Sequence, residues 1–107
     1  MIDQYTVYWV DLNPTRGAEI NKVRLCVVIS PLVMNNHLKT VIIAPVTSQG
    51  RDGYPTRTKI NIGIITGWIV LDQIRAIDKS RLCDLVGKLC DDEIAAIKNI
   101  IKEMLVE

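Results

Sequence analysis

The chain has 107 residues, and nearly half of them are hydrophobic, so we expect one folded domain over residues 1–107 rather than a disordered chain. The net charge is only +1, which excludes a uniformly basic or acidic protein. The charge is unevenly divided, however. Pro14 to Ile60 holds seven basic and two acidic residues, and Asn61 to the end holds six basic and eight acidic residues. The basic part favours an anionic partner, although the same charges could simply solvate loops.

The predicted elements are mostly short strands. In chain order they cover Tyr5–Leu12, Leu25–Ile29, Val41–Ala44, Arg57–Ile62, Trp68–Leu71 and Arg81–Leu89. Pro and Gly punctuate them: Asn13 to Gly17 ends the first strand, Pro45 ends the third, and Gly87 interrupts the last. Thr15–Val23 and Ser48–Pro55 are predicted loops, and Asn35–His37 is a predicted turn.

Only the C-terminal segment has a helical pattern. Ile94, Ile97, Ile101 and Met104 or Leu105 recur every three or four residues and form one apolar face. The acidic run Asp91-Asp92-Glu93 suits the positive end of a helix dipole, so we interpret it as a helix start and not as a magnesium site. The chain therefore predicts a mainly β fold, a small and partly open β-barrel, with a C-terminal α-helix packed on it.

The cysteines and the single histidine do not suggest a metal centre or a cofactor. Cys26, Cys83 and Cys90 are irregularly spaced, and Cys26 lies in an apolar run where a buried small hydrophobe is expected. His37 fits a surface turn better than a catalytic role. The N-terminus lacks the pattern of a signal peptide, and no apolar run has membrane-spanning length. We therefore expect the protein to reside in the reducing cytoplasm.

Several segments, in order along nearly the whole chain, resemble the MazF/PemK family of toxins. They are Tyr8–Glu19 (YWVDLNPTRGAE), Arg24–Pro31 (RLCVVISP), Asn35-Asn36, Ala44–Ser48 (APVTS), Tyr54-Pro55, Leu71–Arg75 (LDQIR) and Ile77-Asp78. The resemblance implies an SH3-like barrel that forms a homodimer. It also implies an endoribonuclease that cleaves single-stranded RNA or mRNA at short recognition sequences and that a cognate antitoxin neutralises. We expect this cleavage to need no metal, because the sequence has no tight carboxylate cluster outside the predicted helix start.

The same resemblance implies that Arg24 and Thr47 are the catalytic pair and that Glu19 borders the RNA. The residue types suit the chemistry, because RNA carries its own nucleophile, the ribose 2′-hydroxyl. The guanidinium of Arg24 presents a rigid fork of donors to phosphate oxygens, and the Thr47 hydroxyl could donate to phosphate or orient the 2′-hydroxyl. Glu19 could act as a base or hold Arg24. Without the motif, a surface arginine paired with Glu19 or Asp72 and a turn-capping Thr47 would be the commoner situations.

Further polar residues are predicted to contact the RNA. They are Thr15, Arg16, Asn21, Lys22, Ser48, Gln49, Arg51, Arg57, Asp72 and Gln73. Trp9 and Trp68 lie in strand patterns and are predicted to belong to the core rather than to stack on bases.

Two other functions remain compatible with the sequence. Small barrels often only bind nucleic acid or protein, so a non-catalytic SH3-like binding module is the first alternative. The second is a toxin of similar fold that poisons DNA gyrase. An RNA cleavage assay and a supercoiling assay distinguish these alternatives from an endoribonuclease.

Overall fold

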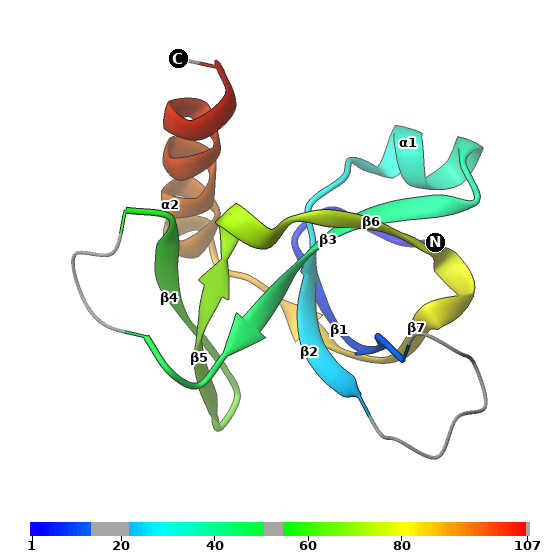
Figure 1. Ribbon diagram of the computed structural model, residues 1–107, viewed down its shortest axis with the longest axis horizontal. Coiled ribbons are helices and arrows are strands. Elements are labelled where there is room, and N and C mark those ends of the chain that lie inside the picture. The colour runs from blue at the N-terminus through cyan, green and yellow to red at the C-terminus, as the bar shows by residue number, and fades with distance from the viewer. Residues whose placement is uncertain (14–21, 51–54, 107) are drawn as a thin grey trace.

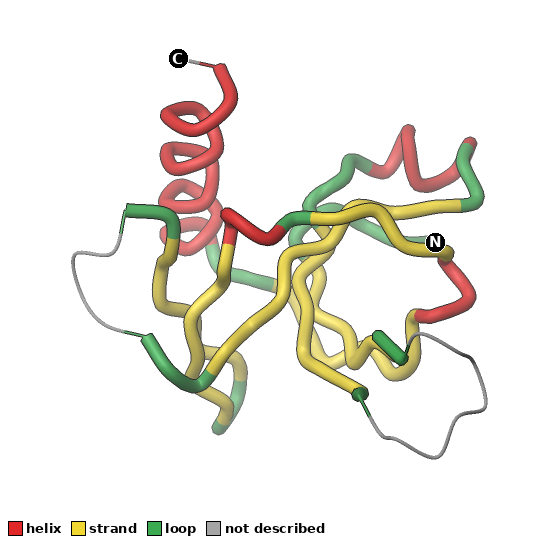
Figure 2. The backbone as a smooth tube through the Cα atoms, in the orientation of Figure 1, coloured by secondary structure: helices red, strands yellow, loops and turns green. Residues whose placement is uncertain are grey.

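The computed structural model describes residues 1–13, 22–50 and 55–106. Seven strands form one curled antiparallel sheet: β1 (Thr6–Asp11), β2 (Val23–Val28), β3 (Thr40–Thr47), β4 (Arg57–Ile62), β5 (Ile65–Val70), β6 (Arg75–Asp78) and β7 (Leu82–Lys88). Their order is β4-β5-β3-β2-β1-β7, and β6 pairs with β3. The helices are α1 (Leu32–His37) and α2 (Asp91–Ile101), and α2 continues as a π-helical turn (Lys102–Val106). Figures 1 and 2 show the curled sheet, with α2 beside β4 and β5 and α1 at the opposite end.

This architecture confirms the predicted mainly β, partly open barrel with a C-terminal helix. The predicted strand Arg57–Ile62 has the same bounds as β4, and the other predicted strands overlap their observed strands. The strand β6 was not predicted, and short 3-10 turns at Leu71–Gln73 and Lys79–Arg81 flank it. Gly87 does not interrupt the last strand, because it pairs with Val7 inside β7.

Two further sequence expectations were wrong. The segment Asn35–His37 belongs to helix α1 and is not an open turn. The Asn35 side chain is buried there because its amide donates to the carbonyls of Ile2 and Ser30, at 2.9 and 3.0 Å. β3 also continues through Pro45. On the edge of β3 away from β2, residues 40–43 pair with β6 and residues 46–47 with β5. Pro45 lies between these pairings, so its missing N–H removes no ladder bond from that edge.

The sheet has an apolar core on each face, because residues of one strand alternate between faces. In β2, Leu25 and Val27 belong to a core that α2 covers with Ile97, whereas Cys26 and Val28 belong to the other. The second core lies where β1, β2, β3 and β6 curl together, around Val10, Val41, Ile43 and Ile77. Strands that contribute side chains to both cores therefore connect the two cores. The buried parts of these strands fix the position of the exposed strand ends.

Helix α2 begins as the acidic run predicts, but through a specific cap. Glu93 accepts a hydrogen bond from the backbone N–H of Cys90 at 2.9 Å, which is half of a capping box. Its second carboxylate oxygen accepts from the N–H of Asn61 in β4 at 2.7 Å. Ile97 is fully buried, and Ile94, Ile101 and Met104 pack against the core, whereas Leu105 is exposed. Among the described residues, no helix combines the length and apolar content needed to cross a bilayer.

Candidate active site

The candidate site lies where β2 and β3 separate. The two strands pair through Val28–Ile43, Val27–Ala44 and Cys26–Pro45, and the pairing ends there. Beyond this point β3 turns to β5, with Val46 opposite Ile69 and Thr47 opposite Trp68. The start of β2 remains paired with β1. The divergence of β2 and β3 is visible in Figure 1.

A groove of about 450 Å³ occupies this separation. Leu25 and Val46 contribute apolar lining, and Trp9 from β1 and Ile65 from β5 line it as well. The polar lining comes from both separating strand ends and from β5: Lys22, Arg24, Thr47, Ser48 and Thr66. The groove therefore combines apolar surface with two cationic side chains, a composition suited to an anionic ligand that also has flat apolar parts.

A second hollow of about 210 Å³ shares part of this lining. Arg24, Val46 and Thr47 line both hollows, and Arg57, Val70 and Gln73 line only the smaller one. Arg24 and Thr47 therefore lie at the junction of two recesses. The β2–β3 register explains why they meet: two residues beyond Cys26–Pro45 on each strand are Arg24 and Thr47.

The two junction side chains differ in how they are held. Arg24 is exposed, and no side chain within residues 1–13, 22–50 and 55–106 forms a hydrogen bond or ion pair with its guanidinium. The Thr47 hydroxyl oxygen accepts a hydrogen bond from the backbone N–H of Gln49 at 3.2 Å. This is the turn-capping role that the sequence allowed. It leaves the hydroxyl proton available, because a hydroxyl both accepts and donates.

The turn after Thr47 rests on an aromatic ring. A Cβ built on Gly50 would lie 2.1 Å from Cγ of Trp68, so the backbone of Gly50 packs directly against the indole. Trp68 is also the strand partner of Thr47. The absence of a side chain at position 50 therefore lets the turn carrying the Thr47–Gln49 hydrogen bond lie close to β5.

Cys26 lies two residues after Arg24 on β2, but its thiol is not suited to act as a nucleophile. Its thiol is fully buried, and burial raises its pKa to about 12 despite the nearby charges of Arg24 and Arg75. A thiol with this pKa stays protonated at neutral pH, as expected for the small hydrophobe that the sequence predicts. Within the described parts of the chain, no three His, Cys, Asp or Glu side chains are grouped to hold a metal ion.

Comparison with known proteins assigns this chain to a family. The sequence profile of PemK-like, MazF-like toxins of type II toxin-antitoxin systems matches residues 3–105. The chain belongs to this family. It is 30% identical over 104 residues to the endoribonuclease toxin MazF of Escherichia coli K12, a match that covers 96% of this chain and 93% of the relative.

Solved structures of similar proteins share the fold of this toxin. MazF from Deinococcus radiodurans aligns with a TM-score of 0.80 and 25% identity over 99% of this chain and 97% of that chain. A mycobacterial endoribonuclease, solved in complex with its cognate antitoxin, aligns with a TM-score of 0.83 and 20% identity over 99% of this chain and 96% of that chain. The second likeness is one of fold alone.

The toxin brings together many of the residues that its sequence nominates. Arg24 and Thr47 line both hollows, Lys22 and Ser48 line the groove, and Arg57 and Gln73 line the smaller hollow. Gln49 is exposed beside Thr47. Asp72 lines neither hollow and accepts a hydrogen bond from the Thr56 hydroxyl at 2.8 Å, so it is not paired with Arg24. The nominated residues Thr15, Arg16, Glu19, Asn21 and Arg51 lie outside the described residues.

The sequence prediction included four of the groove residues and missed the other seven: Trp9, Val23, Leu25, Val46, Ile65, Thr66 and Gly67. The placement of Trp9 in the core was wrong, because its side chain is 37% exposed. Its strand position could not reveal this exposure, which depends on where β2 and β3 part. His37, in contrast, is an exposed surface residue as predicted, with Nδ1 2.8 Å from the carbonyl oxygen of Val33.

Proposed function

We propose that the groove between β2 and β3 is where this toxin, an endoribonuclease, cleaves single-stranded RNA or mRNA at short recognition sequences. The observation that supports this proposal most is the junction of the two hollows, where Arg24 and Thr47 meet from separate strands. A phosphate at this junction would leave room on either side for the flanking nucleotides. The endoribonuclease activity of the Escherichia coli relative supports the same reaction here.

Arg24 is the group that we assign to the scissile phosphate. Its guanidinium is exposed at the groove, while the next residues of β2 are buried and paired on both sides. A rigid strand therefore presents a fork of N–H donors. Such a fork binds two phosphate oxygens at once and stabilises the additional negative charge of the pentacoordinate transition state.

Thr47 is assigned a smaller role at the same phosphate. The Gln49 N–H fixes the position of its oxygen, so the hydroxyl proton can point to a phosphate oxygen or to the 2′-hydroxyl. A neutral donor contributes less than a charged one. Ser48, next to it, is the weaker candidate for the same hydrogen bond.

The proposed reaction uses the nucleophile in the substrate. The 2′-oxygen loses its proton to a base, attacks phosphorus, and forms the O2′–P bond while the P–O5′ bond breaks. The leaving 5′-oxygen takes up a proton. The products are a 2′,3′-cyclic phosphate and a 5′-hydroxyl. Because the RNA itself supplies the nucleophile, the proposed reaction needs no cofactor. Glu19 is our candidate for the base or for the residue that orients Arg24.

The remaining nominated residues are proposed to hold the RNA. Lys22 and Arg57, which line different hollows, are suited to phosphates on opposite sides of the cut. Ser48, Gln49 and Gln73 carry donors and acceptors that can contact sugar or base edges. We extend the same expectation to Thr15, Arg16, Asn21, Arg51 and Asp72.

The test uses one RNA and a copy with a single 2′-deoxy sugar at the cut site. Cut sites are first mapped on a long RNA, and both short substrates are then incubated with purified toxin in excess EDTA. We expect cleavage of the all-ribose strand with a cyclic phosphate product, and none of the 2′-deoxy strand. Loss of cleavage in EDTA would show that a metal is required. Cutting at the 2′-deoxy position would remove the internal nucleophile.

We further propose that the toxin acts in the cytoplasm as a homodimer and is neutralised by a cognate antitoxin. The mycobacterial endoribonuclease and the Deinococcus radiodurans MazF have been solved with antitoxins, which supports a protein partner of this kind. Exposed apolar side chains such as Val33, Leu85 and Val106 leave surface for a second copy. Light scattering at micromolar concentration should give the dimer mass, and an active monomer would contradict the proposal.

A further inference from the structure

Trp9 is a large aromatic residue that the core does not enclose. Its neighbours Val7 and Val10 on β1 are fully buried, whereas 37% of the Trp9 side chain is exposed. Burial of an indole is one of the larger apolar contributions available to so small a domain. An indole left open to solvent on a rigid strand, inside a groove, therefore marks a surface suited to a ligand.

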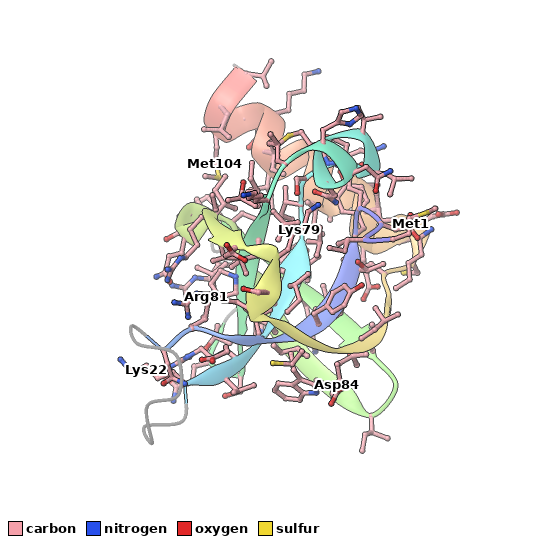
Figure 3. All side chains as sticks on the ribbon, turned by 90° about the vertical axis from the view of Figure 1, so that its right-hand side faces the viewer. Met1, Lys22, Lys79, Arg81, Asp84 and Met104 are labelled. Carbon is pink, nitrogen blue, oxygen red and sulfur yellow. The ribbon has the colours of Figure 1, made fainter. Side chains whose placement is uncertain are left out.

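The strand pairing around Trp9 explains its exposure. On one side it pairs with Leu25, the first buried residue of β2, which lines the same groove. On the other side, Tyr8 pairs with Leu85 and Val10 with Leu82, so two β7 residues, Cys83 and Asp84, oppose Trp9 alone. Such a bulge bends the strand that carries it, and bulges are frequent beside functional sites. Asp84 is labelled on this stretch of β7 in Figure 3.

The surroundings of Trp9 indicate what kind of ligand fits. The indole shares the groove with Arg24 and Thr47, while Ile65 and Gly67 of β5 line it from another strand. Lys22 also lines the groove and is labelled at the start of β2 in Figure 3. A flat apolar surface thus shares one recess with the groups assigned to phosphate. Single-stranded RNA has this combination, because its unstacked bases lie within one nucleotide of each phosphate.

We propose that Trp9 is a stacking platform for a base of the bound RNA, at a nucleotide adjacent to the scissile phosphate. This inference rests on the proposed function, and it assigns Trp9 to substrate binding and not to bond cleavage. Every base offers a π-face, so the platform contributes affinity and position without hydrogen-bond selectivity. It also orients the nucleotide, so that Arg24 and Thr47 meet the phosphate in one geometry.

The first experiment compares Trp9→Leu with Trp9→Phe and Trp9→Tyr on the mapped RNA substrate. Stacking on an aromatic ring changes binding by about 5- to 150-fold per base. We therefore expect Trp9→Leu to raise KM in this range with kcat changed much less, and the two aromatic variants to recover most of the loss. Equal effects of all three variants, or a loss confined to kcat, would overturn the proposal. Thermal unfolding of each variant identifies any that lose activity by unfolding.

The second experiment locates the base. Nucleotides on either side of the cut are replaced one at a time by abasic sites, and KM is measured with wild-type toxin and with Trp9→Leu. At the stacked nucleotide, the abasic change and Trp9→Leu should each raise KM similarly, and together hardly more than either alone. Fully additive effects at every position would contradict stacking.

The third experiment needs no cleavage and so separates this proposal from the proposed function. In a Trp68→Phe background, Trp9 is the sole tryptophan, and its fluorescence is followed as the 2′-deoxy RNA is added. Saturable quenching, lost with the abasic strand, supports stacking even if no cleavage is ever observed. Unchanged fluorescence with an RNA that the toxin cleaves would overturn the stacking role of Trp9 without contradicting the proposed endoribonuclease function. An effect of Trp9→Leu on antitoxin affinity alone would instead assign the indole to a protein partner.

Discussion

The two ends of the β2–β3 pair differ in almost every property. At the closed end, Val27, Val28, Ile43 and Ala44 are completely buried and the strands pair directly. At the open end, Val23 and Arg24 of β2 are exposed, and β3 no longer pairs with β2 but with β5. The same two strands therefore supply a rigid apolar base and a polar groove. The division suggests that side chains at the open end can be changed without unfolding the protein, whereas those at the closed end cannot.

The sharpest test of this division is Arg24→Ala. Loss of one preorganised donor to the transition state typically costs about 10²- to 10³-fold in rate, and a charged donor belongs at the upper end. We expect cleavage of the mapped RNA to fall by this amount while the thermal midpoint stays close to wild type, because Arg24 is exposed. Arg24→Lys should recover only part of the rate, since an ammonium group lacks the planar fork.

The matched control at the closed end is Ile43→Ala. It should lower the free energy of unfolding by about 2–5 kcal/mol, the usual range for truncating a fully buried Ile. The fraction that remains folded should cleave RNA at nearly the wild-type rate. If Arg24→Ala destabilises the protein as much as Ile43→Ala does, the two ends are not separate in function.

Thr47→Ala is expected to have an intermediate effect. It removes a neutral donor near the phosphate and also the acceptor that holds the Gln49 N–H. We expect cleavage to fall by about 10- to 100-fold, less than for Arg24→Ala, because neutral hydrogen bonds contribute less than charged ones. Thr47→Ser keeps the hydroxyl and serves as the control. Near wild-type cleavage by Thr47→Ala would restrict this residue to the turn.

Gly50→Ala tests whether the turn beyond Thr47 must lie against Trp68. An added Cβ would meet the indole 2.1 Å away, so the turn must shift or the ring must rotate. Overpacking of this kind usually costs about 1–3 kcal/mol, and we expect a several-fold fall in kcat as Thr47 moves. The double variant with Trp68→Leu should recover activity by opening space. Failure of this rescue would assign the glycine a different role.

The smallest expected effect is a difference in reactivity among the three cysteine thiols. Cys26 is buried, with a pKa of about 12, while Cys83 and Cys90 are exposed. Alkylation at pH 8 in native buffer should therefore modify the two exposed thiols and leave Cys26 unmodified until denaturant is added. Mass spectrometry counts the modified sites. Rapid labelling of Cys26 in the native protein would mean that the closed end opens readily.

Local patterns predicted the strands and the helix well, because alternation and helical periodicity report burial directly. Arg57–Ile62 and the apolar face of α2 are the clearest cases. The errors at Asn35 and Pro45 have a different origin, since both depend on partners distant in sequence. Asn35 is satisfied by Ile2, 33 residues away, and Pro45 is tolerated because β3 changes partners beside it.

The candidate site also contains residues that the sequence could predict and residues whose role depends on distant parts of the chain. Arg24 and Thr47 were nominated by their place in recognisable segments, and the register of β2 and β3 brings them to one junction. The exposure of Trp9 could not be predicted, because it arises from a separation of strands and a bulge in β7 that no local pattern encodes. Residue type and motif thus indicated the polar side of the groove, while its aromatic side required the three-dimensional structure.

The capping carboxylate of Glu93 ties the last helix to the sheet through a proton-sensitive contact. Burial raises the pKa of this carboxyl, but the hydrogen bonds from Asn61 and Cys90 outweigh it and leave the pKa below its ordinary value. A lowered pKa means that the contact stabilises the fold fully at pH values above the ordinary, unfolded-state pKa of the carboxyl. This stabilisation is lost as the pH falls through the lower pKa of the folded state. Acid should therefore release the start of α2 from β4 before it melts the strands. In amide exchange, Asn61 and the first turn of α2 would lose protection ahead of the sheet, and this corner of the molecule would act as its first foldon to open.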